Sequence, residues 1–582
     1  MSPKKKMWQI SESNVENEKE LVEKLGVSSQ IAQILINRGI TTVETAEEFL
    51  DPHIDKMHSP FLFEDMQKVV ERIEHAIANE ELILIYGDYD VDGITSVSLF
   101  LSYLRTIGGK VLYHIPKRLD EGYGMNVDAI EKASKHGVKL LITVDCGIGS
   151  IEEVKRAYAL GMDVIVTDHH EPLDILPECI GIINPKVKGS QYPFKHLAGV
   201  GVAFKVCQAL WERRGKPTGE EDIFKYIDIV ALGTIADVVS LLGENRIIIK
   251  HGIDKINTNP CPGIKALIGL SSISGKQITS NGVSFVLAPK INACGRLGDP
   301  SIGVKLVLAK DIGVAEEIAK TLNDENIKRQ QIEAEILEEA TGQLSQIDQE
   351  NVRAIVLASE DWHTGVIGIA ASKIAEMTYR PTFLIAIDED GVGKGSGRSI
   401  AEFDLHNALK ECSDLLIKFG GHSQAAGMSI EKEKIPEFTK RFDEIAAKHL
   451  KDSKLKPILK VDCSLDNSNI TLDFVKELKK LEPHGLANPI PVFASKGLSV
   501  VECRSVGNEG DHLKLKLGLG NSIFDAIGFR MGKKYGDYHD EVVNSGNVDV
   551  VYTLDINTWG RVMTPELIVK DIREYSEENQ WR

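Results

Sequence analysis

The sequence has few cysteines for its length, and their spacing follows no pattern. The eight cysteines among 582 residues include no CxxC pair, so neither a zinc knuckle nor a disulfide framework is expected. No apolar run approaches the length of a membrane span, and the basic start MSPKKKMWQI leads into no apolar stretch long enough for a signal peptide. We therefore expect a protein of the reducing cytoplasm with no membrane segment.

The sequence also lacks an excess of positive charge. Its net charge of −18 argues against indiscriminate binding to phosphate backbones, unless basic residues gather locally or bound cations invert the field. A hydrophobic share of 42% with 26% charged residues is ordinary for a globular protein, and no internal repeat or low-complexity tract is present. At 582 residues the chain is too long for one core, so three or four domains are expected.

The first half of the chain alternates strand and helix patterns. Short apolar runs, each followed by a helical stretch, predict a parallel sheet made of βαβ units: LILIYG, VLYHIP, KLLITVDCG and DVIVTDHH. Between Ile312 and about Leu344 the chain lacks proline and is dense in Glu, Lys, Ala and Leu, which predicts a long exposed helix that acts as a connector.

A second α/β region and a β-rich region complete the predicted organisation. VRAIVLAS and PTFLIAI predict strands of the second α/β region. Short β-rich runs after about Lys456 predict a small barrel or sandwich. The predicted fold is therefore a parallel-sheet α/β domain, a long helix, a smaller α/β domain and a β-barrel. The predicted limits are 1–60 for an N-terminal segment that packs on the core and 61–310 for the catalytic domain. They are 311–345 for the helix, 346–452 for the second α/β domain and 453–582 for the barrel.

Acidic and imidazole side chains follow three of the predicted strands. Asp88, Asp90 and Asp92 come after the first strand, Asp145 after the third, and Asp168, His169 and His170 after the fourth. Each acid alone could be a solvated loop residue or a helix N-cap. Because the carboxyl ends of parallel strands lie along one edge of the sheet, we expect these side chains to converge.

The chemistry of these residues favours a metal site. Asp237 adds an acid inside an otherwise apolar helix, where an unpaired charge would be unfavourable. Carboxylates with one or two imidazoles and no thiolate favour Mn²⁺ or Mg²⁺ over zinc. The ligands suffice for two ions with a bridging carboxylate: Asp90, Asp92, Asp145, His169 and Asp237. Two such ions stabilise the attacking and leaving oxygens at phosphorus, so hydrolysis of a phosphoester is expected.

The ordered motifs resemble those of a known superfamily. DYDVDG, TVDCG, VTDHH and GTIADVV are similar to the four motifs of the DHH phosphoesterases, and FGGHSQAAGMS is similar to the glycine-rich motif of their DHHA1 partner domain. More narrowly, IPKRLDEGYG, PKINACGRLGDP, EDWHTGVIGIAASKIAE and GKGSGRS resemble the bacterial RecJ family of single-strand-specific exonucleases. The likeness extends over nearly the whole chain and implies a final oligonucleotide-binding (OB) barrel.

The resemblance implies a role for each candidate residue. Asp90 would serve one metal, Asp92, His169 and Asp237 the other, with Asp145 as the bridge; His170 would lie beside the scissile phosphate and Asp88 would be a peripheral ligand. The resemblance also implies a pocket for the terminal 5′ phosphate from Arg118, Ser396 and Arg398, and it implies that Asn292, Arg296 and His422 lie near the DNA backbone. Surface ion pairs for the arginines, and close packing for the glycines around His422, are the plainer alternatives. Cys294 stands where relatives often have alanine, and this departure leaves the neighbouring Asn292 and Arg296 in place.

The expected activity is metal-dependent 5′-to-3′ hydrolysis of single-stranded DNA to mononucleotides, in recombination and repair. The final barrel would extend the track of the strand beyond the active site, so removal of the chain after about Lys456 is expected to weaken binding to long single strands and to spare hydrolysis of very short ones. The alternative is a structural barrel that binds nothing. The rivals are a small-substrate relative that hydrolyses short RNA, cyclic dinucleotides or pyrophosphate, and a noncatalytic DNA-binding factor. A RecQ-type helicase and a single-strand-binding protein are the partners that the resemblance implies, and a monomer is expected.

Overall fold

The computed structural model describes most of the chain and divides it into two compact units. Unit 1 comprises Met1–Ala46, Gln330–Leu481 and Ile490–Arg582, and unit 2 comprises Glu47–Arg329 and Glu482–Pro489. The described residues are 6–12, 15–118, 120–122, 124–348, 351–451, 455–466, 468–532, 546–557 and 563–576. The predicted domain limits stay predictions, and four of them, residues 1, 452, 453 and 582, lie outside the described residues.

Unit 2 is built on a five-stranded parallel sheet. Its strand order is β3-β2-β4-β5-β6. The bounds are Lys110–His114 for β3, Leu82–Tyr86 for β2, Val138–Val144 for β4, Asp163–Thr167 for β5 and Gly181–Ile183 for β6. The first four strands confirm the sequence prediction, whereas β6, with the short sequence GII, was not predicted. An apolar run of three residues is too short to be told from a loop by its pattern.

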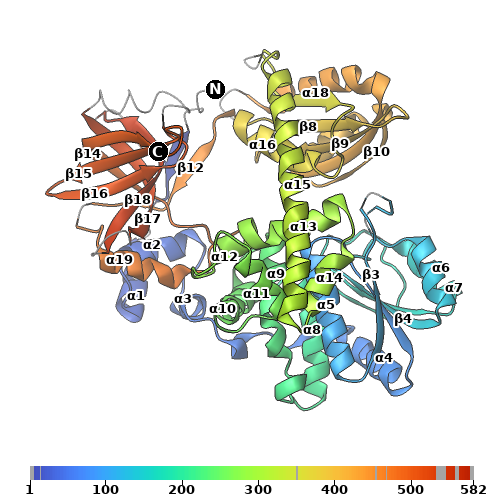
Figure 1. Cartoon of the computed structure of the whole chain (residues 1–582). Coiled ribbons are helices and arrows are strands. Elements are labelled where there is room, and N and C mark those ends of the chain that lie inside the picture. Colours follow the sequence, from blue (N-terminus) through green and yellow to red (C-terminus); the bar gives the residue numbers. More distant parts are fainter. Residues whose placement is uncertain are drawn as a thin grey trace. The chain divides into compact units, whose positions relative to one another are not determined.

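Alternate side chains of each strand enter two different cores. Ile83 and Ile85 of β2 pack in the core formed with α4 (Met66–Ala78), α5 (Val91–Thr106) and α8 (Gly199–Arg213). Leu84 and Tyr86 enter the core on the opposite face, with α6 (Val127–Lys135) and α7 (Ile151–Ala159). Figure 1 shows these two helical layers on either side of β4. Because both faces are covered, the strands are continuously apolar, and polar groups collect at their ends.

Several further helices complete unit 2. The apolar helix α9, Ile227–Ala236, is buried on all sides and ends at Asp237. The others are α10 (Gly243–Thr258), α11 (Pro262–Gly269), α12 (Ser280–Gly282), α13 (Ala288–Leu297) and α14 (Ser301–Leu308), with a π-helical turn at Val283–Leu287. The 33-residue helix α15, Ile312–Leu344, confirms the predicted long helix. In the described part of the chain, no helix is long and apolar enough to cross a membrane.

Unit 1 contains the second α/β domain, with a mixed five-stranded sheet. The strand order is β10-β11-β9-β8-β7, in which only β7 and β8 pair in parallel. The strands are β7 (Ile355–Ser359), β8 (Thr382–Ile387), β9 (Val392–Arg398), β10 (Leu416–Gly421) and β11 (Ala425–Glu431). The helices are α16 (Ile367–Thr378), α17 (Leu405–Glu411) and α18 (Ile435–His449). Phe383 of β8 packs edge-on against Phe438 and Phe442 of α18 and anchors that helix on the sheet.

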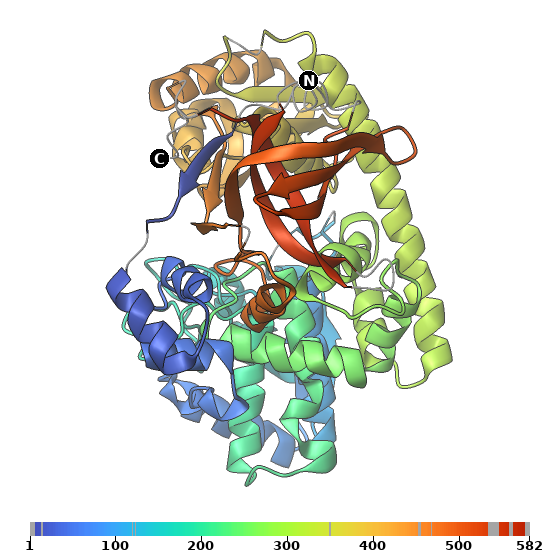
Figure 2. The same ribbon diagram turned by 90° about the vertical axis from the view of Figure 1, so that its left-hand side faces the viewer.

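The remainder of unit 1 is a closed β-barrel with the N-terminal segment. β14 pairs with both β15 and β17, so β14-β15-β16-β18-β17 closes into a five-stranded barrel (Figure 2). This arrangement confirms the predicted barrel over a sandwich. The elements are β12 (Ile458–Val461), β13 (Cys463–Ser464), α19 (Leu472–Leu478), β14 (Phe493–Val506), β15 (His512–Leu519), β16 (Ser522–Gly528), β17 (Asn547–Asn557) and β18 (Thr564–Glu574).

The N-terminal segment begins with a strand that pairs with the section before the barrel. β1, Met7–Ile10, runs parallel to β12, and Trp8 donates a hydrogen bond to the Asp571 carboxylate of β18 over 2.7 Å. The helices that follow are α1 (Val15–Leu25), α2 (Ser29–Asn37) and α3 (Val43–Leu50). The strand β1 is therefore held by the last strand of the barrel.

Candidate metal centre

The residues predicted to bind metal converge at the carboxyl edge of the parallel sheet in unit 2. Three sets of side chains each place one ligand atom per residue within 4.8 Å of the others: Asp88, Asp90 and Asp145; Asp92, His169 and Asp237; and Asp145, His169 and His170. The second and third sets share His169, and the first and third share Asp145. This overlap places all of the predicted ligands in one continuous cluster.

The start of α5 fixes two of the carboxylates. Asp90 is the N-cap, and its Oδ1 accepts the backbone N–H of Gly93 over 3.0 Å. Asp92, 1% exposed in the first turn, accepts the N–H of Gly199 over 2.6 Å and that of Val200 over 2.8 Å. These two N–H groups begin α8, where the helix dipole favours a negative charge. Two helix N-termini thus orient acids from one short motif.

Asp145 occupies a strained backbone position directly after β4. Its φ of +59° lies in the left-handed region, and its N–H donates to the Thr167 carbonyl over 3.1 Å. The side chain is 2% exposed and places Oδ1 3.1 Å from His169 Nε2. Non-glycine residues in this conformation persist only where the surroundings hold them, and such strain collects at functional sites.

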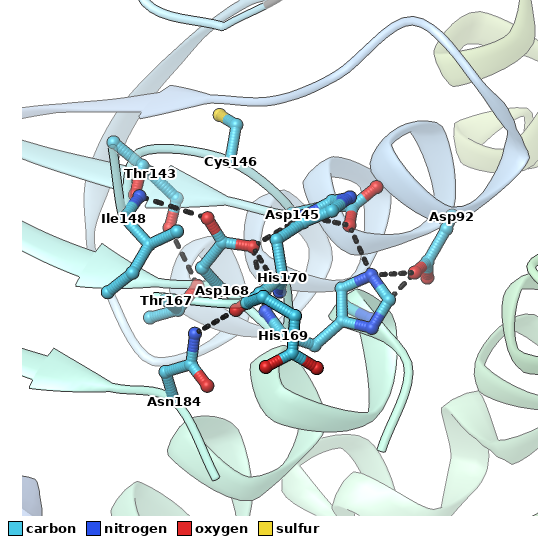
Figure 3. A network of polar contacts seen from close by, with 12 residues as sticks. Asp92, Thr143, Asp145, Cys146, Ile148, Thr167, Asp168, His169, His170 and Asn184 are labelled. Atoms are coloured by element: carbon cyan, nitrogen blue, oxygen red, sulfur yellow. Dashed lines mark hydrogen bonds and ion pairs between the residues drawn. The ribbon is translucent and has the colours of Figure 1, made fainter. Parts of the chain in front are cut away.

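Asp168 orients the two histidines (Figure 3). Its Oδ1 accepts the N–H of His169 over 2.7 Å, the N–H of His170 over 3.1 Å and His170 Nδ1 over 2.8 Å, and its Oδ2 accepts the Ile148 N–H over 3.0 Å. Burial favours the neutral carboxyl, but these hydrogen bonds and the charge of His170 outweigh it, so the pKa of Asp168 is lowered. Asp168 was seen in the sequence as part of the motif, but its orienting role was not predicted.

Several atoms of the cluster are buried without a hydrogen-bond partner. They are Asp88 Oδ1, Asp145 Oδ1, His169 Nε2 and Asp237 Oδ2. Burial, followed by repulsion from neighbouring carboxylates, raises the pKa of Asp88, Asp145 and Asp237 well above the ordinary value and that of Asp92 to about 7. Burial and the neighbouring His170 lower the pKa of His169 to about 3, which leaves its ring neutral and able to ligate.

This donor set fits divalent cations. Buried polar atoms without partners are rare in native proteins, because their desolvation is unfavourable. Oxygen ligands with a single neutral imidazole suit Mn²⁺ and Mg²⁺. The only cysteine in the motifs that surround the site, Cys146, is fully buried, and burial raises the pKa of its thiol well above the ordinary value, so a thiolate is not available. The cluster therefore matches the predicted metals.

The other predicted residues of unit 2 flank the centre. Asn292 of α13 accepts the N–H of Val91 over 3.1 Å and so lies at the start of α5. The Arg118 guanidinium lies 5.3 Å from the centre of the Tyr89 ring. A Cβ built on Gly295 would lie 2.3 Å from the Tyr89 carbonyl, so the α13 turn that carries Arg296 also lies against Tyr89. Tyr89 links these residues and was missed in the sequence, because it stands between two acids that dominate the motif.

Ser396, Arg398 and His422 lie in unit 1. Arg398 donates to Ser396 Oγ over 3.2 Å and to the Gly397 carbonyl over 2.7 Å at the end of β9. A Cβ built on Gly368, in the first turn of α16, would lie 2.9 Å from Ser396 Oγ and 3.0 Å from an Arg398 nitrogen. A guanidinium and a hydroxyl thus lie beside a helix N-terminus, a combination that suits an anion. His422 is exposed in the turn before β11.

A pocket in unit 2 opens directly beside the predicted metal ligands. It encloses about 830 Å³, and its lining includes His169, His170, Asp237, Val238, Leu486 and Ala487. Leu486 and Ala487 belong to the segment Glu482–Pro489, which joins unit 2 from the end of the chain that forms the barrel. No sequence pattern pointed to this segment.

Comparisons with known proteins agree with this arrangement. Residues 82–234 match the DHH family, N-terminal domain; residues 351–448 match the DHHA1 domain; and residues 461–571 match the RecJ OB domain. The single-stranded-DNA-specific exonuclease RecJ of Bacillus subtilis is 38% identical over 574 residues, which cover 98% of this chain and 71% of that protein. This chain belongs to the RecJ family. The RecJ of Escherichia coli is 35% identical, with 87% of this chain and 90% of that protein covered.

Solved RecJ structures share the fold. The crystal structure of RecJ in complex with Mn²⁺ from Thermus thermophilus matches with a TM-score of 0.83 and 29% identity, and covers 98% of this chain and 80% of that one. Its complex with Mg²⁺ matches with a TM-score of 0.77 and 28% identity, with 98% and 79% covered. The predicted fold class, family and metal cofactors are confirmed, whereas the roles of individual residues stay predictions.

Proposed function

We propose that this protein hydrolyses single-stranded DNA from the 5′ end to mononucleotides and needs two divalent cations, Mn²⁺ or Mg²⁺. The observation that carries the proposal is the set of buried ligand atoms that lack a hydrogen-bond partner, at the sheet edge of a RecJ-family chain. Recombination and DNA repair are the processes in which such an activity would be used.

In this proposal the ligands divide between two cations. Asp90 would hold one, Asp92, His169 and Asp237 would hold the other, and Asp145, which belongs to two of the three ligand sets, would serve both. Asp88 has a ligand atom within 4.8 Å of those of Asp90 and Asp145, so a direct ligand role is as well supported as a peripheral one. When bound, the two cations supply charge stabilisation for the attacking and leaving oxygens at phosphorus.

His170 has a separate role, as a hydrogen-bond donor to the scissile phosphate. Burial opposes its protonation, but the hydrogen bond and charge of Asp168 outweigh burial and raise the pKa of His170. Asp168 accepts the Nδ1 proton, and Asn184 donates to the His170 carbonyl over 2.9 Å. Because Asp168 engages Nδ1, Nε2 is the ring nitrogen that would donate to a phosphate oxygen, and a charged donor makes the stronger bond.

Phosphate recognition is assigned to each unit separately. Arg118, Asn292 and Arg296 would bind strand phosphates in unit 2, and Ser396, Arg398 and His422 would do so in unit 1. Arg398 is proposed to take the terminal 5′ phosphate, because its planar guanidinium can hold the anion with two bonds beside the first turn of α16.

The test is a digest of single- and double-stranded DNA labelled at either end, with Mn²⁺, Mg²⁺ or EDTA. Label should leave the 5′ end of the single strand first and only when a divalent cation is present. Release from the 3′ end, or preferred hydrolysis of short RNA, a cyclic dinucleotide or pyrophosphate, would reject the proposal in favour of another phosphoesterase activity.

The cellular setting is proposed from the cysteines and the family. Eight cysteines that are all free suit the cytoplasm. The family resemblance supports a RecQ-type helicase and a single-strand-binding protein as partners of a monomeric enzyme. Sedimentation of the purified protein alone, and then with each partner, tests the oligomeric state and the interactions.

A further inference from the structure

The segment Glu482–Pro489, here called the return loop, comes from a distant part of the chain yet belongs to unit 2. Both of its flanks, Leu481 and Ile490, belong to unit 1. In the sequence the return loop follows α19 and the short helical turn after it, and the first long strand of the barrel comes next. Within unit 2 it contributes Leu486 and Ala487 to the lining of the pocket beside the predicted metal ligands. Because the residues on both sides of the loop belong to unit 1, specific contacts must hold the loop in unit 2.

The anchor is a buried arginine. Arg246 is 2% exposed and donates to the Glu482 carbonyl over 2.9 Å and to the Phe49 carbonyl over 2.6 Å. Its guanidinium also lies 3.7 Å from the centre of the Phe49 ring. Because a buried guanidinium must be satisfied by acceptors, the loop's carbonyl is part of what stabilises this charge. The loop is therefore fixed to unit 2 at its first residue.

Further hydrogen bonds hold the loop up to its tip. Ser280 Oγ donates to the His484 carbonyl over 2.6 Å, and the Leu241 N–H donates to the Leu486 carbonyl over 2.9 Å. A Cβ built on Gly485 would lie 2.4 Å from Leu241 Cδ1, so a glycine permits this close approach. The backbone of Leu486 is thus fixed by hydrogen bonding while its side chain remains available to contact a ligand.

The tip presents apolar side chains next to the metal ligands. Leu486 is 55% exposed and lines the pocket with Ala487, whose φ is +64°. Val238, which directly follows the ligand Asp237, lines the same pocket, is 60% exposed and has a φ of +58°. A β-branched residue is seldom held in that conformation, so its exposure beside a metal ligand marks a functional position.

We propose that Leu486 and Val238 form an apolar contact for the base of the nucleotide whose phosphate reaches the metal ligands. The proposal rests on the proposed nuclease function. The lining of the pocket combines polar side chains, among them His169, His170 and Asp237, with apolar ones, among them Val238 and Leu486, and a nucleotide needs both kinds of contact, for its phosphate and for its base. Apolar contact with a base face does not depend on the identity of the base, as an exonuclease requires.

This assignment changes the expectation for a truncated chain. Removal of everything after about Lys456 would remove the return loop together with the barrel. Affinity for very short strands should then fall as well, rather than only affinity for long ones.

The direct test uses Leu486→Ala in the full chain, because a half-exposed side chain can be shortened without a cavity. KM for a 5′-phosphorylated tetranucleotide should rise roughly three- to tenfold, with kcat changed less than twofold. Mn²⁺ affinity, measured by calorimetry, should equal that of the wild type. The matched control is Leu270→Ala, which shortens a leucine that is 45% exposed at the end of α11, outside the pocket, and should change neither constant.

A set of strands with one abasic position each identifies the contacted base. At the position that occupies the pocket, removal of the base should abolish the difference in KM between the wild type and Leu486→Ala, since both lack the same contact. Binding of a slowly cleaved phosphorothioate strand gives the same comparison without turnover. Inhibition by free mononucleotide tests whether the pocket binds a base within the strand or the released product.

The outcomes separate this inference from the nuclease proposal. If the wild type releases no nucleotides from single strands, the proposed function fails. If the wild type is active but Leu486→Ala retains the wild-type KM, or if its defect is equal at every abasic position, the base contact is rejected while the nuclease activity stands.

Discussion

Gly199 lies against the carboxylate of Asp145, and a Cβ atom built on Gly199 would lie only 2.5 Å from Asp145 Oδ1. The N–H of the same glycine donates to Asp92 Oδ2 over 2.6 Å. The first residue of α8 therefore sets the distance between two acids that come from different strand ends. A side chain at position 199 cannot coexist with Asp145 in its present place.

Gly199→Ala should therefore damage the metal centre without unfolding the protein. Alanine favours a helix over glycine by about 1 kcal/mol, so the helix itself would tolerate the change. The methyl group would displace the Asp145 carboxylate, and a ligand moved by about 1 Å should lower activity by roughly 100-fold. Calorimetric titration with Mn²⁺ and a nuclease assay on a short single strand measure the two effects.

The control for this substitution is Gly269→Ala. Gly269 ends α11, and a Cβ built there would meet no atom within 4 Å. This variant should bind Mn²⁺ and cleave DNA as the wild type does. If Gly199→Ala binds Mn²⁺ with wild-type affinity, displacement of the Asp145 carboxylate does not affect metal binding. The central role assigned to Asp145 in the metal centre would then be contradicted.

Asp145→Ala should lower turnover more than Asp88→Ala does. Asp145 contributes to two of the three ligand sets, whereas Asp88 contributes to one. Loss of a residue outside direct metal contact typically lowers activity by roughly 10- to 100-fold, which is the loss expected for Asp88→Ala if it is peripheral. Metal content by mass spectrometry of the native protein, together with kcat, decides the comparison. Equal losses in kcat with both metals retained in Asp145→Ala would contradict the bridging assignment.

Much of the fold and of the candidate site could be predicted because its signals are local. The apolar runs that form β2, β4 and β5 are continuous, and the acids that follow them must share one edge of a parallel sheet. Asp237 stood out as a charge inside a predicted apolar helix, but its predicted place was wrong: α9 ends at Ala236, and Asp237 is the C-cap residue.

The missed features depend on contacts between distant residues. Gly199 reads in the sequence as one more helical residue. The need for a glycine at this position is evident only from the folded position of Asp145. Leu486 lies far from Asp237 in the sequence, and its place in the pocket depends on the buried Arg246, which no local pattern reveals. The role of Asp168 was hidden because hydrogen bonds, rather than residue type, distinguish an orienting acid from a ligand.

Metal binding should weaken as the pH falls. Burial and repulsion between carboxylates raise the pKa of Asp92 to about 7 and that of Asp145 and Asp237 well above the ordinary value, so protons compete with the cations. A folded-state pKa above the unfolded value of 3.8 stabilises the metal-free protein at low pH, and this contribution is lost as the pH rises through about 7. The rise in Tm that Mn²⁺ produces over EDTA should therefore be larger at high pH.

Thermal unfolding with Mn²⁺ or EDTA between about pH 6 and about pH 8 measures this difference, since the window spans the folded-state pKa. The comparison at each pH cancels groups elsewhere in the chain that titrate in both samples. A shift in Tm that does not depend on pH would mean that the site carboxylates are already ionised without metal.

The last prediction concerns the direction of hydrolysis. If Arg398 binds the terminal phosphate, a strand with a 5′ phosphate should be cleaved faster than the same strand with a 5′ hydroxyl, because charge-assisted bonds need the anion. Arg398→Ala should reduce this preference by roughly 10- to 150-fold, which corresponds to the roughly 1.5–3 kcal/mol that a hydrogen bond to a charged group contributes. Arg398→Lys keeps the charge but loses the planar pair of donors, so it should recover only part of the preference.

Arg441→Ala serves as the control for a lost arginine in the same unit. Arg441 of α18 forms exposed ion pairs with Asp414, which precedes β10, and with Glu437 of the same helix, and such surface pairs contribute little. Its variant should keep the wild-type preference and the wild-type Mn²⁺ affinity. Because Arg398 belongs to unit 1 and the metal ligands belong to unit 2, Arg398→Ala should also leave Mn²⁺ affinity unchanged. A wild-type enzyme indifferent to the 5′ phosphate would remove Arg398 as the determinant of direction, whatever its variants do to the rate.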